Sequence, residues 1–268
     1  MTNPVVESAD PLLQEPDAAY LPEWPPGQDE LPYDDGIPME TWRHKCQMDL
    51  LISITETWLQ KRPDGFVSGN MFLYYSLEQS RSRDFKGPDY FVVLGVPKGE
   101  RKSWVIWEQG KGPDVVIELL SQSTAQADKT HKKQLYEQII RVPEYFWFDP
   151  FAPEDWAGFR LLGSQYVPIE PDAQGRLKSE ALGLYLVKWT GSFRGIDTTW
   201  IRWATEVGEL LPTEAEQERL LAEQERQRAE QERQRAESAE QRAESAEQRA
   251  ERLAQKLREL GVDPGTLS

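Results

Sequence analysis

VVIELLSQST, residues 115–124, is the stretch that decides the fold, together with GPDYFVVLG (87–95) before it and PEYFWFDP (143–150) after it. Each contains a short apolar run bounded by turn-forming residues, which is typical of a buried strand. Between the last two stretches, residues 127–141 have the spacing of a helix. Strands that are followed by a helix and a further strand predict an α/β domain.

Outward from this block the apolar pattern continues in both directions. Upstream, five apolar residues recur every fourth position and predict an amphipathic helix that ends at Arg62-Pro63-Asp64-Gly65: Trp42, Cys46, Leu50, Ile54 and Trp58. In the helix over residues 127–141, we expect Leu135, Ile139 and Ile140 to face the core. Further short strands are predicted at Phe66–Tyr75, Trp104–Trp107, Phe159–Ile169, Gly183–Val187 and Trp200–Ala204. The domain is expected to span residues 38–206.

The C-terminal segment, residues 207–268, has a different composition. Thr213 and Glu216 have the spacing of a capping box at the start of a helix, and Gly261 and Pro264 indicate its end. The sequence between them repeats every seven residues. The repeat places alanines at one position of the heptad seam and glutamates at the other in its first half. Leucine occupies seam positions only near the C-terminal end of the helix. We therefore expect a long charged helix over residues 213–260. A solvated single helix and a weak coiled coil that forms a homodimer are both compatible with this seam.

The charge is unevenly distributed. The formal net charge is −15, yet residues 1–37 hold nine acidic residues and no basic one, whereas residues 38–206 are nearly neutral. The N-terminal segment is also proline-rich, and it is expected to be a disordered, solvated arm. The sequence has no apolar run long enough to cross a membrane, no signal segment and a single cysteine, Cys46, which is typical of a cytoplasmic protein. The acidity therefore does not exclude DNA as a partner of the middle domain.

Two acidic residues stand where predicted strands begin or end. Asp89 opens one strand and Glu118 lies near the end of another. If the two strands are antiparallel, these residues become neighbours although they are far apart in sequence. Either residue alone is weak support for a site, because Pro-Asp before a strand is more often a turn and a buried Glu is more often half of an ion pair. Pro113-Asp114 lies at the far end of the second strand, too distant to share a metal with Glu118.

A cation near the two acids would complete a hydrolytic site. Mg²⁺ binds one or two carboxylates together with water and substrate phosphate, and such a metal activates water. In the helix that follows Glu118, Asp128, Lys132 and Tyr136 recur at spacing four and share a face. We predict that Lys132 positions the water or stabilises the phosphate, and that the neighbouring Lys133 points elsewhere.

The ordered block resembles the Uma-two family of restriction-endonuclease-like proteins, a branch of the PD-(D/E)xK nuclease superfamily, over roughly residues 38–206. The resemblance rests on Pro88-Asp89, Val115–Thr124, Asp128, Lys132, Tyr136 and Pro143–Pro150. It implies a restriction-endonuclease-like αβββαβ core with extra strands, a dependence on Mg²⁺ or Mn²⁺, and phosphodiester hydrolysis.

Carried over by position, Asp89 and Glu118 match the metal-binding acids of that superfamily. The superfamily motif has lysine two residues after the second acid, where this chain has Leu120. The resemblance implies that the lysine has moved to the following helix, at Lys132. Asp128, Gln134 and Tyr136 are expected to hold the metal-binding side chains in place without contacting the metal themselves.

Two functions from different classes fit these observations. The first is a Mg²⁺-dependent endodeoxyribonuclease with Asp89, Glu118 and Lys132 as its catalytic residues. The alternative is a catalytically inactive nuclease fold that binds a partner or self-associates through its C-terminal helix. Binding of a divalent cation separates the two, since only the enzyme needs Asp89 and Glu118 to share one.

Overall fold

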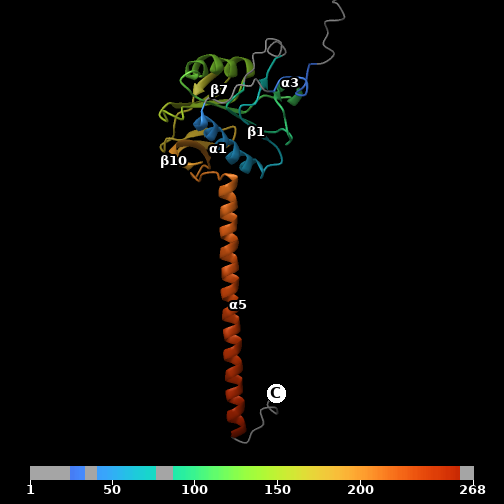
Figure 1. The fold of residues 1–268 in the computed structure, drawn as a ribbon, viewed down its shortest axis with the longest axis vertical. Coiled ribbons are helices and arrows are strands. Elements are labelled where there is room, and N and C mark those ends of the chain that lie inside the picture. Colours follow the sequence, from blue (N-terminus) through green and yellow to red (C-terminus); the bar gives the residue numbers. More distant parts are fainter. Residues whose placement is uncertain (1–24, 34–40, 77–86, 260–268) are drawn as a thin grey trace, which may run out of the picture. The chain divides into compact units, whose positions relative to one another are not determined.

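The computed structural model describes residues 25–33, 41–76 and 87–259, which form two compact units, Met1–Thr213 and Glu214–Ser268 (Figure 1). The first unit extends past the predicted boundary at residue 206. Its last segment folds back on the final strand, where Leu210 pairs with Ala204 and the Leu211 amide donates to the Trp203 carbonyl.

A six-stranded sheet forms the centre of the first unit, in the order β1-β3-β5-β6-β7-β8. The strands are β1 (Phe66–Ser68), β3 (Tyr90–Val93), β5 (Val115–Leu119), β6 (Glu144–Phe148), β7 (Trp156–Leu162) and β8 (Gln165–Pro168). Only β5 and β6 are parallel among these pairs. A parallel pair needs a long crossover, and the helical segment between the two strands supplies it. The predicted αβββαβ order is confirmed, and β7 and β8 extend the sheet.

One face of the sheet is covered by α1 (Trp42–Leu59) and by a second sheet of three strands. As predicted, the apolar spacing of α1 buries Cys46, Leu50 and Ile54, whereas Trp42 in the first turn is exposed. The Thr41 side chain caps this first turn. The second sheet consists of β9 (Leu177–Ser179), β10 (Leu184–Phe193) and β11 (Ile196–Ala204). The helix α1 and the second sheet share one apolar core with the side chains of β3, β5 and β6 that point toward this face.

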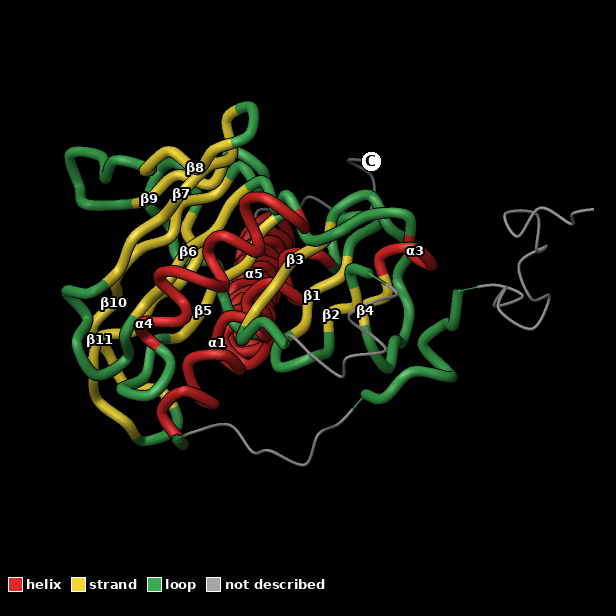
Figure 2. Tube along the Cα trace, turned by 90° about the horizontal axis from the view of Figure 1, so that it is seen from above, coloured by secondary structure: helices red, strands yellow, loops and turns green. Residues whose placement is uncertain are grey.

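The opposite face is covered by the crossover, which Figures 1 and 2 show on the other side of the strands from α1. It consists of α4 (Ala125–Ala127), η2 (Asp128–Lys132) and η3 (Leu135–Ile140), and the last two are π-helical. The predicted α-helical face is wrong: Ile139 is 62% exposed and Leu135 is half-buried, whereas Tyr136 is fully buried. The wider i→i+5 turn rotates residues 132, 136 and 140 toward the sheet, so only Ile140 packs as expected.

A small parallel pair, β2 (Leu73–Tyr74) with β4 (Trp104–Val105), precedes the short helix α3 (Ile106–Gln109). The run predicted as one strand over residues 66–75 is therefore split, because β1 and β2 pair in different sheets.

Residues 25–33 pack on this corner of the molecule. Leu31 is buried beside Phe72 and Val105, and Lys102 pairs with Asp29 at 2.8 Å. The expectation of a solvated arm is therefore wrong for residues 25–33, because Leu31 and these polar contacts offset the cost of ordering the segment. The remainder of residues 1–37 lies outside the described residues.

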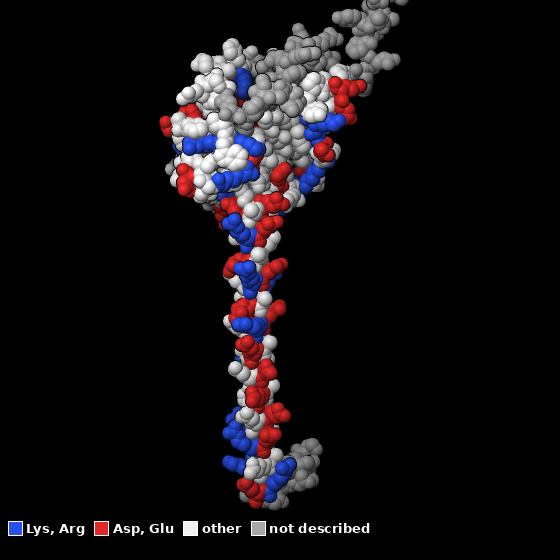
Figure 3. All heavy atoms as spheres, in the orientation of Figure 1, with Lys and Arg blue, Asp and Glu red and all other residues white. Residues whose placement is uncertain are grey.

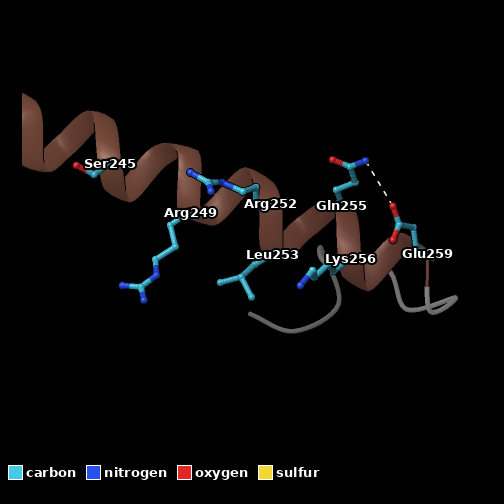
Figure 4. Close-up of a pocket in the computed structure, with 7 residues that line it drawn as sticks. All are labelled: Ser245, Arg249, Arg252, Leu253, Gln255, Lys256 and Glu259. Atoms are coloured by element: carbon cyan, nitrogen blue, oxygen red, sulfur yellow. Dashed lines mark hydrogen bonds between the residues drawn. The ribbon is translucent and has the colours of Figure 1, made fainter.

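The second unit contains one helix, α5 (Glu214–Glu259), in which no side chain is buried. Acidic and basic side chains alternate along it, as Figure 3 shows, and Arg233 pairs with Glu230 and Glu237. Near its end, Arg249, Leu253 and Lys256 point to one side of the helix, and Gln255 donates to Glu259 on another (Figure 4). The predicted charged helix is confirmed, whereas the coiled coil stays a prediction. In the described residues no helix is long and apolar enough to cross a membrane.

Candidate active site

The register of β3 against β5 brings Asp89 to Glu118. Tyr90 lies opposite Ile117 and Phe91 opposite Val116, so the next pair outward in this antiparallel ladder is Asp89 with Glu118. Residues directly opposite each other have Cβ atoms about 5 Å apart. The two acids predicted from sequence are therefore neighbours, on the sheet face that the π-helical crossover covers.

Each carboxylate is held by a donor of its own. The backbone amide of Leu119 donates to Asp89 Oδ2 at 2.7 Å, so the start of β3 is tied to the end of β5. Glu118 is fully buried, and its Oε1 accepts a hydrogen bond from the Tyr136 hydroxyl at 2.8 Å. Its Oε2 accepts from Lys132 Nζ at 3.0 Å. Both acids are thus fixed in orientation by strand and helix positions rather than by loops.

Lys132 bridges two acids from η2. Its ammonium lies 3.0 Å from Glu118 and 2.7 Å from Asp128 one turn back, and its side chain is 26% exposed. Asp128 is fully buried, and its backbone carbonyl accepts from the Tyr145 hydroxyl. As their spacing of four predicts, residues 128, 132 and 136 lie along the side that faces β5, and the segment that carries them is largely π-helical. Such turns are frequent at functional sites.

The cluster carries more negative than positive charge, and the pKa values respond to it. Burial first, and then the charge of Glu118, raise the pKa of Asp89 well above that of an ordinary aspartic acid; the same two causes raise the pKa of Asp128. Burial alone would lower the pKa of Lys132, but the three carboxylates outweigh it and the net shift is upward. The lysine therefore stays charged, and a second cation would relieve the remaining repulsion.

The donor set fits a hard divalent cation. Asp89 and Glu118 offer only oxygen atoms, and carboxylate oxygens favour Mg²⁺ or Mn²⁺ over softer metals. Within residues 25–33, 41–76 and 87–259, no three Asp, Glu, His or Cys side chains converge on one point. A cation held there would have two protein carboxylates, with water and substrate oxygens as its remaining ligands, which is the usual arrangement for Mg²⁺.

Not every predicted residue belongs to the site. Gln134 is exposed on the crossover, and the structure does not bring it to the acids, because its spacing of two from Lys132 turns it away from the sheet. Lys133 lies over the Phe159 ring at 3.7 Å and points away from the acids, as expected. Asp114 pairs with Lys111 and accepts from the Leu94 amide, which is a structural role at the far end of β5.

Sequence reasoning missed two contacts that shape the site. The Leu119 amide that orients Asp89 has no side-chain signal, although the register of the two strands could have located it. The sequence indicates Tyr145 only as a strand residue, but its hydroxyl donates to the Asp128 carbonyl and its ring lies tilted against that of Tyr136, with the centroids 5.3 Å apart. Its position in an apolar strand next to a helix with a buried tyrosine is the signal that could have indicated it.

The model of the Uma2 family, described as "Putative restriction endonuclease", matches residues 15–188. Among solved structures, a match is the "Crystal structure of a putative nuclease belonging to DUF820 from Anabaena variabilis ATCC 29413". The two chains are 20% identical, with 60% of this chain and 94% of that one covered and a TM-score of 0.41. No curated protein matches.

Proposed function

The chain belongs to the Uma2 family of restriction-endonuclease-like proteins, and from that premise we propose that it is a metal-dependent endonuclease that hydrolyses phosphodiester bonds in DNA. Mg²⁺ or Mn²⁺ is the proposed cofactor, held by Asp89 and Glu118. Lys132 is the third catalytic residue, and Asp128 and Tyr136 support the other three.

One observation carries the proposal. A fully buried glutamate lies opposite an aspartate at the end of a strand pair, and it accepts from both a lysine and a tyrosine of the same helical segment. A structural ion pair needs one carboxylate for one ammonium. Here Glu118 and Asp128 both contact a single ammonium, and Asp89 lies beside Glu118 and adds a third charge that acts on it, so the repulsion among the carboxylates favours the binding of a further cation.

The residues of the chain then have distinct tasks. A bound Mg²⁺ would activate water and offset charge on the phosphodiester. The Leu119 amide keeps Asp89 oriented toward its partner acid, and the Tyr136 hydroxyl fixes the rotation of the Glu118 carboxylate. Lys132, partly exposed and permanently charged, can contact a phosphate oxygen or orient the attacking water without losing its anchor on Asp128.

The test is cleavage of supercoiled plasmid DNA with Mg²⁺ or Mn²⁺, for the native chain and for Asp89→Asn, Glu118→Gln and Lys132→Met. Loss of one ligand or charge from such a site reduces the rate by about a hundredfold or more. Asp114→Asn is the matched control, because it removes the other Pro-Asp carboxylate at the opposite end of β5. We expect it to retain cleavage at a temperature at which it remains folded, as monitored by circular dichroism.

The rival function is a nuclease fold without chemistry that binds a partner. Titration calorimetry with Mg²⁺ and with Mn²⁺ on the native chain, Asp89→Asn, Glu118→Gln and Asp114→Asn separates the two functions. Metal binding that disappears in Asp89→Asn and Glu118→Gln and persists in Asp114→Asn supports the enzyme. If neither metal binds the native chain and the plasmid stays intact, the proposal is refuted and the binding module takes its place.

A further inference from the structure

A pocket opens where the parallel strands β5 and β6 end. It has a volume of about 810 Å³ and is lined by Thr41, His44, Ser121, Gln122, Ser123, Asp149, Phe151 and Ala152. The carboxyl ends of parallel strands are the usual place for ligands in α/β folds, and the volume lies within the usual range for ligand sites. Neither Asp89 nor Glu118 lines it, so the pocket is separate from the acid cluster.

The rim of the pocket carries an exposed aromatic ring beside an arginine. Phe151 is 56% exposed, and the Arg43 guanidinium lies over its ring at 4.2 Å. Among the described residues no carboxylate pairs with Arg43, whose only hydrogen bond there goes to the Pro150 carbonyl. Arg194, by contrast, is paired with Asp49. The ring therefore offers a flat apolar face beside the positive charge of Arg43, while the Asp149 carboxylate in the lining accepts from the Phe151 and Ala152 amides.

The floor of the pocket is fixed and polar. His44 is 3% exposed, and its two ring nitrogens are hydrogen-bonded to the Thr41 hydroxyl and the Leu120 carbonyl. These two bonds fix the orientation of the ring in the floor of the pocket. Gln122 extends an exposed amide into the lining, and no hydrogen-bond partner for it exists in the described part of the chain. An amide donates and accepts at once, so it can pair with the edge of a planar heterocycle.

The pocket is close to the acids along the chain. Ser121 follows Glu118 by three residues, and at about 3.3 Å per extended residue this is roughly 10 Å. The turn that lines the pocket then leads directly into the segment that carries Asp128 and Lys132. One strand of nucleic acid could therefore contact Lys132 through a phosphate and still place a neighbouring base in the pocket.

We propose that this pocket binds an unpaired nucleobase of the DNA strand that is cleaved, with the base stacked on Phe151, its phosphate near Arg43 and its edge against Gln122. The inference rests on the proposed nuclease function and adds a substrate class, which is DNA with an unstacked base. Aromatic rings with nearby arginines bind single strands in this way, and a base inside a duplex has no free face to offer.

The test measures binding of a fluorescein-labelled oligothymidine by anisotropy, with EDTA present and Glu118→Gln as the background so that nothing is cleaved. Phe151→Ala should weaken binding by about five- to 150-fold, the loss of one base stack. Leu162→Ala is the matched control, since it removes an equally exposed apolar side chain at the other end of the sheet. It should bind as tightly as the background protein, and a blunt duplex of the same length should bind more weakly than the single strand.

A second probe identifies the base. An oligothymidine with one abasic site, moved along the strand, should lose affinity at one position in the background protein and at no position in Phe151→Ala. Equal single-strand affinities for Phe151→Ala and Leu162→Ala would overturn the inference, as would a duplex that binds better and responds equally to both variants. Plasmid cleavage that needs Asp89 while single-strand binding ignores Phe151 would leave the nuclease and remove only the base pocket. The reverse result would remove only the nuclease.

Discussion

Replacing Glu118 by glutamine separates a functional acid cluster from a structural ion pair. The substitution keeps the shape and one carbonyl oxygen, so the Tyr136 hydroxyl still has an acceptor in place of Oε1. It removes the charge that faces Lys132 at 3.0 Å, and with it the repulsion toward Asp89 and Asp128. The sign of the change in unfolding free energy therefore depends on which of these charges dominates.

The contacts allow the magnitude to be worked out. A hydrogen bond to a charged acceptor is worth about 1 kcal/mol more than one to a neutral acceptor, so the change at Tyr136 costs about 1 kcal/mol. Lys132 loses Glu118 but keeps Asp128 at 2.7 Å, and two repulsions with carboxylates are relieved. These effects oppose each other, and we expect the metal-free stability to change by no more than about 1 kcal/mol. Breaking an ordinary buried ion pair would instead cost about 3–5 kcal/mol.

The assay is urea unfolding of the native chain and Glu118→Gln at neutral pH, first with EDTA and then with saturating Mg²⁺. Saturation at a hundred times the dissociation constant adds about 2.7 kcal/mol to the native chain. The variant, which lacks one of the two metal ligands, should gain far less. A loss of 3 kcal/mol or more in EDTA, with no effect of Mg²⁺ on either protein, would refute the reasoning and make Glu118 a structural residue.

The other predictions concern the same cluster and the C-terminal helix. Burial and the charge of Glu118 raise the pKa of Asp89, so its carboxyl must lose a proton to bind metal. The affinity for Mg²⁺ should therefore rise with pH above about 4. Calorimetry in buffers of different ionisation enthalpy measures the proton that is released. Lys132→Met leaves three carboxylates without a cation, and it should lower the free energy of unfolding by about 2–3 kcal/mol at pH 8 in EDTA. The loss should be smaller at pH 5, because the acids whose pKa is raised take up protons there. Urea unfolding at both pH values checks this. Tyr136→Phe leaves a buried carboxylate oxygen without its donor and should cost about 1.5–3 kcal/mol by the same measurement. Removal of residues 214–268 should abolish the proposed homodimer, as seen by sedimentation velocity, and leave metal-dependent plasmid cleavage unchanged.

The pairing of Asp89 with Glu118 could be predicted from sequence because a strand has a fixed period and an antiparallel ladder has a fixed register. Once Tyr90 is paired with Ile117 in an antiparallel ladder, the acids one step outward must face each other. The heptad helix was equally accessible, since local repeats and caps specify it without any tertiary contact. The helix prediction uses information that lies within a few residues along the chain, whereas the prediction of the acid pair also requires that two strands far apart in sequence pair antiparallel.

The errors arise where tertiary packing overrides the local pattern. Residues 125–140 have helical spacing, but the sequence does not show that the turns widen to the π form, which buries Tyr136 and exposes Ile139. Gln134 lies away from the acids because it is two residues, about half a turn, from Lys132, and the spacing alone could have shown this. Residues 25–33 resemble a solvated arm in composition, and only the fold reveals the corner beside Val105 into which Leu31 fits.

The absence of lysine two residues after Glu118 is the strongest sequence objection to a nuclease, and the geometry answers it. Residues 118 and 120 are neighbours on one side of a strand by its period of two, and Leu120 is fully buried, so a charged group there would need a partner in the core. An ammonium that enters from the crossover avoids this cost. Lys132 reaches the same carboxylate with its side chain partly exposed, and Asp128 anchors it from the preceding turn. What the chemistry requires is a cation at Glu118 that substrate can also reach, and the helix supplies that position better than the buried end of the strand would.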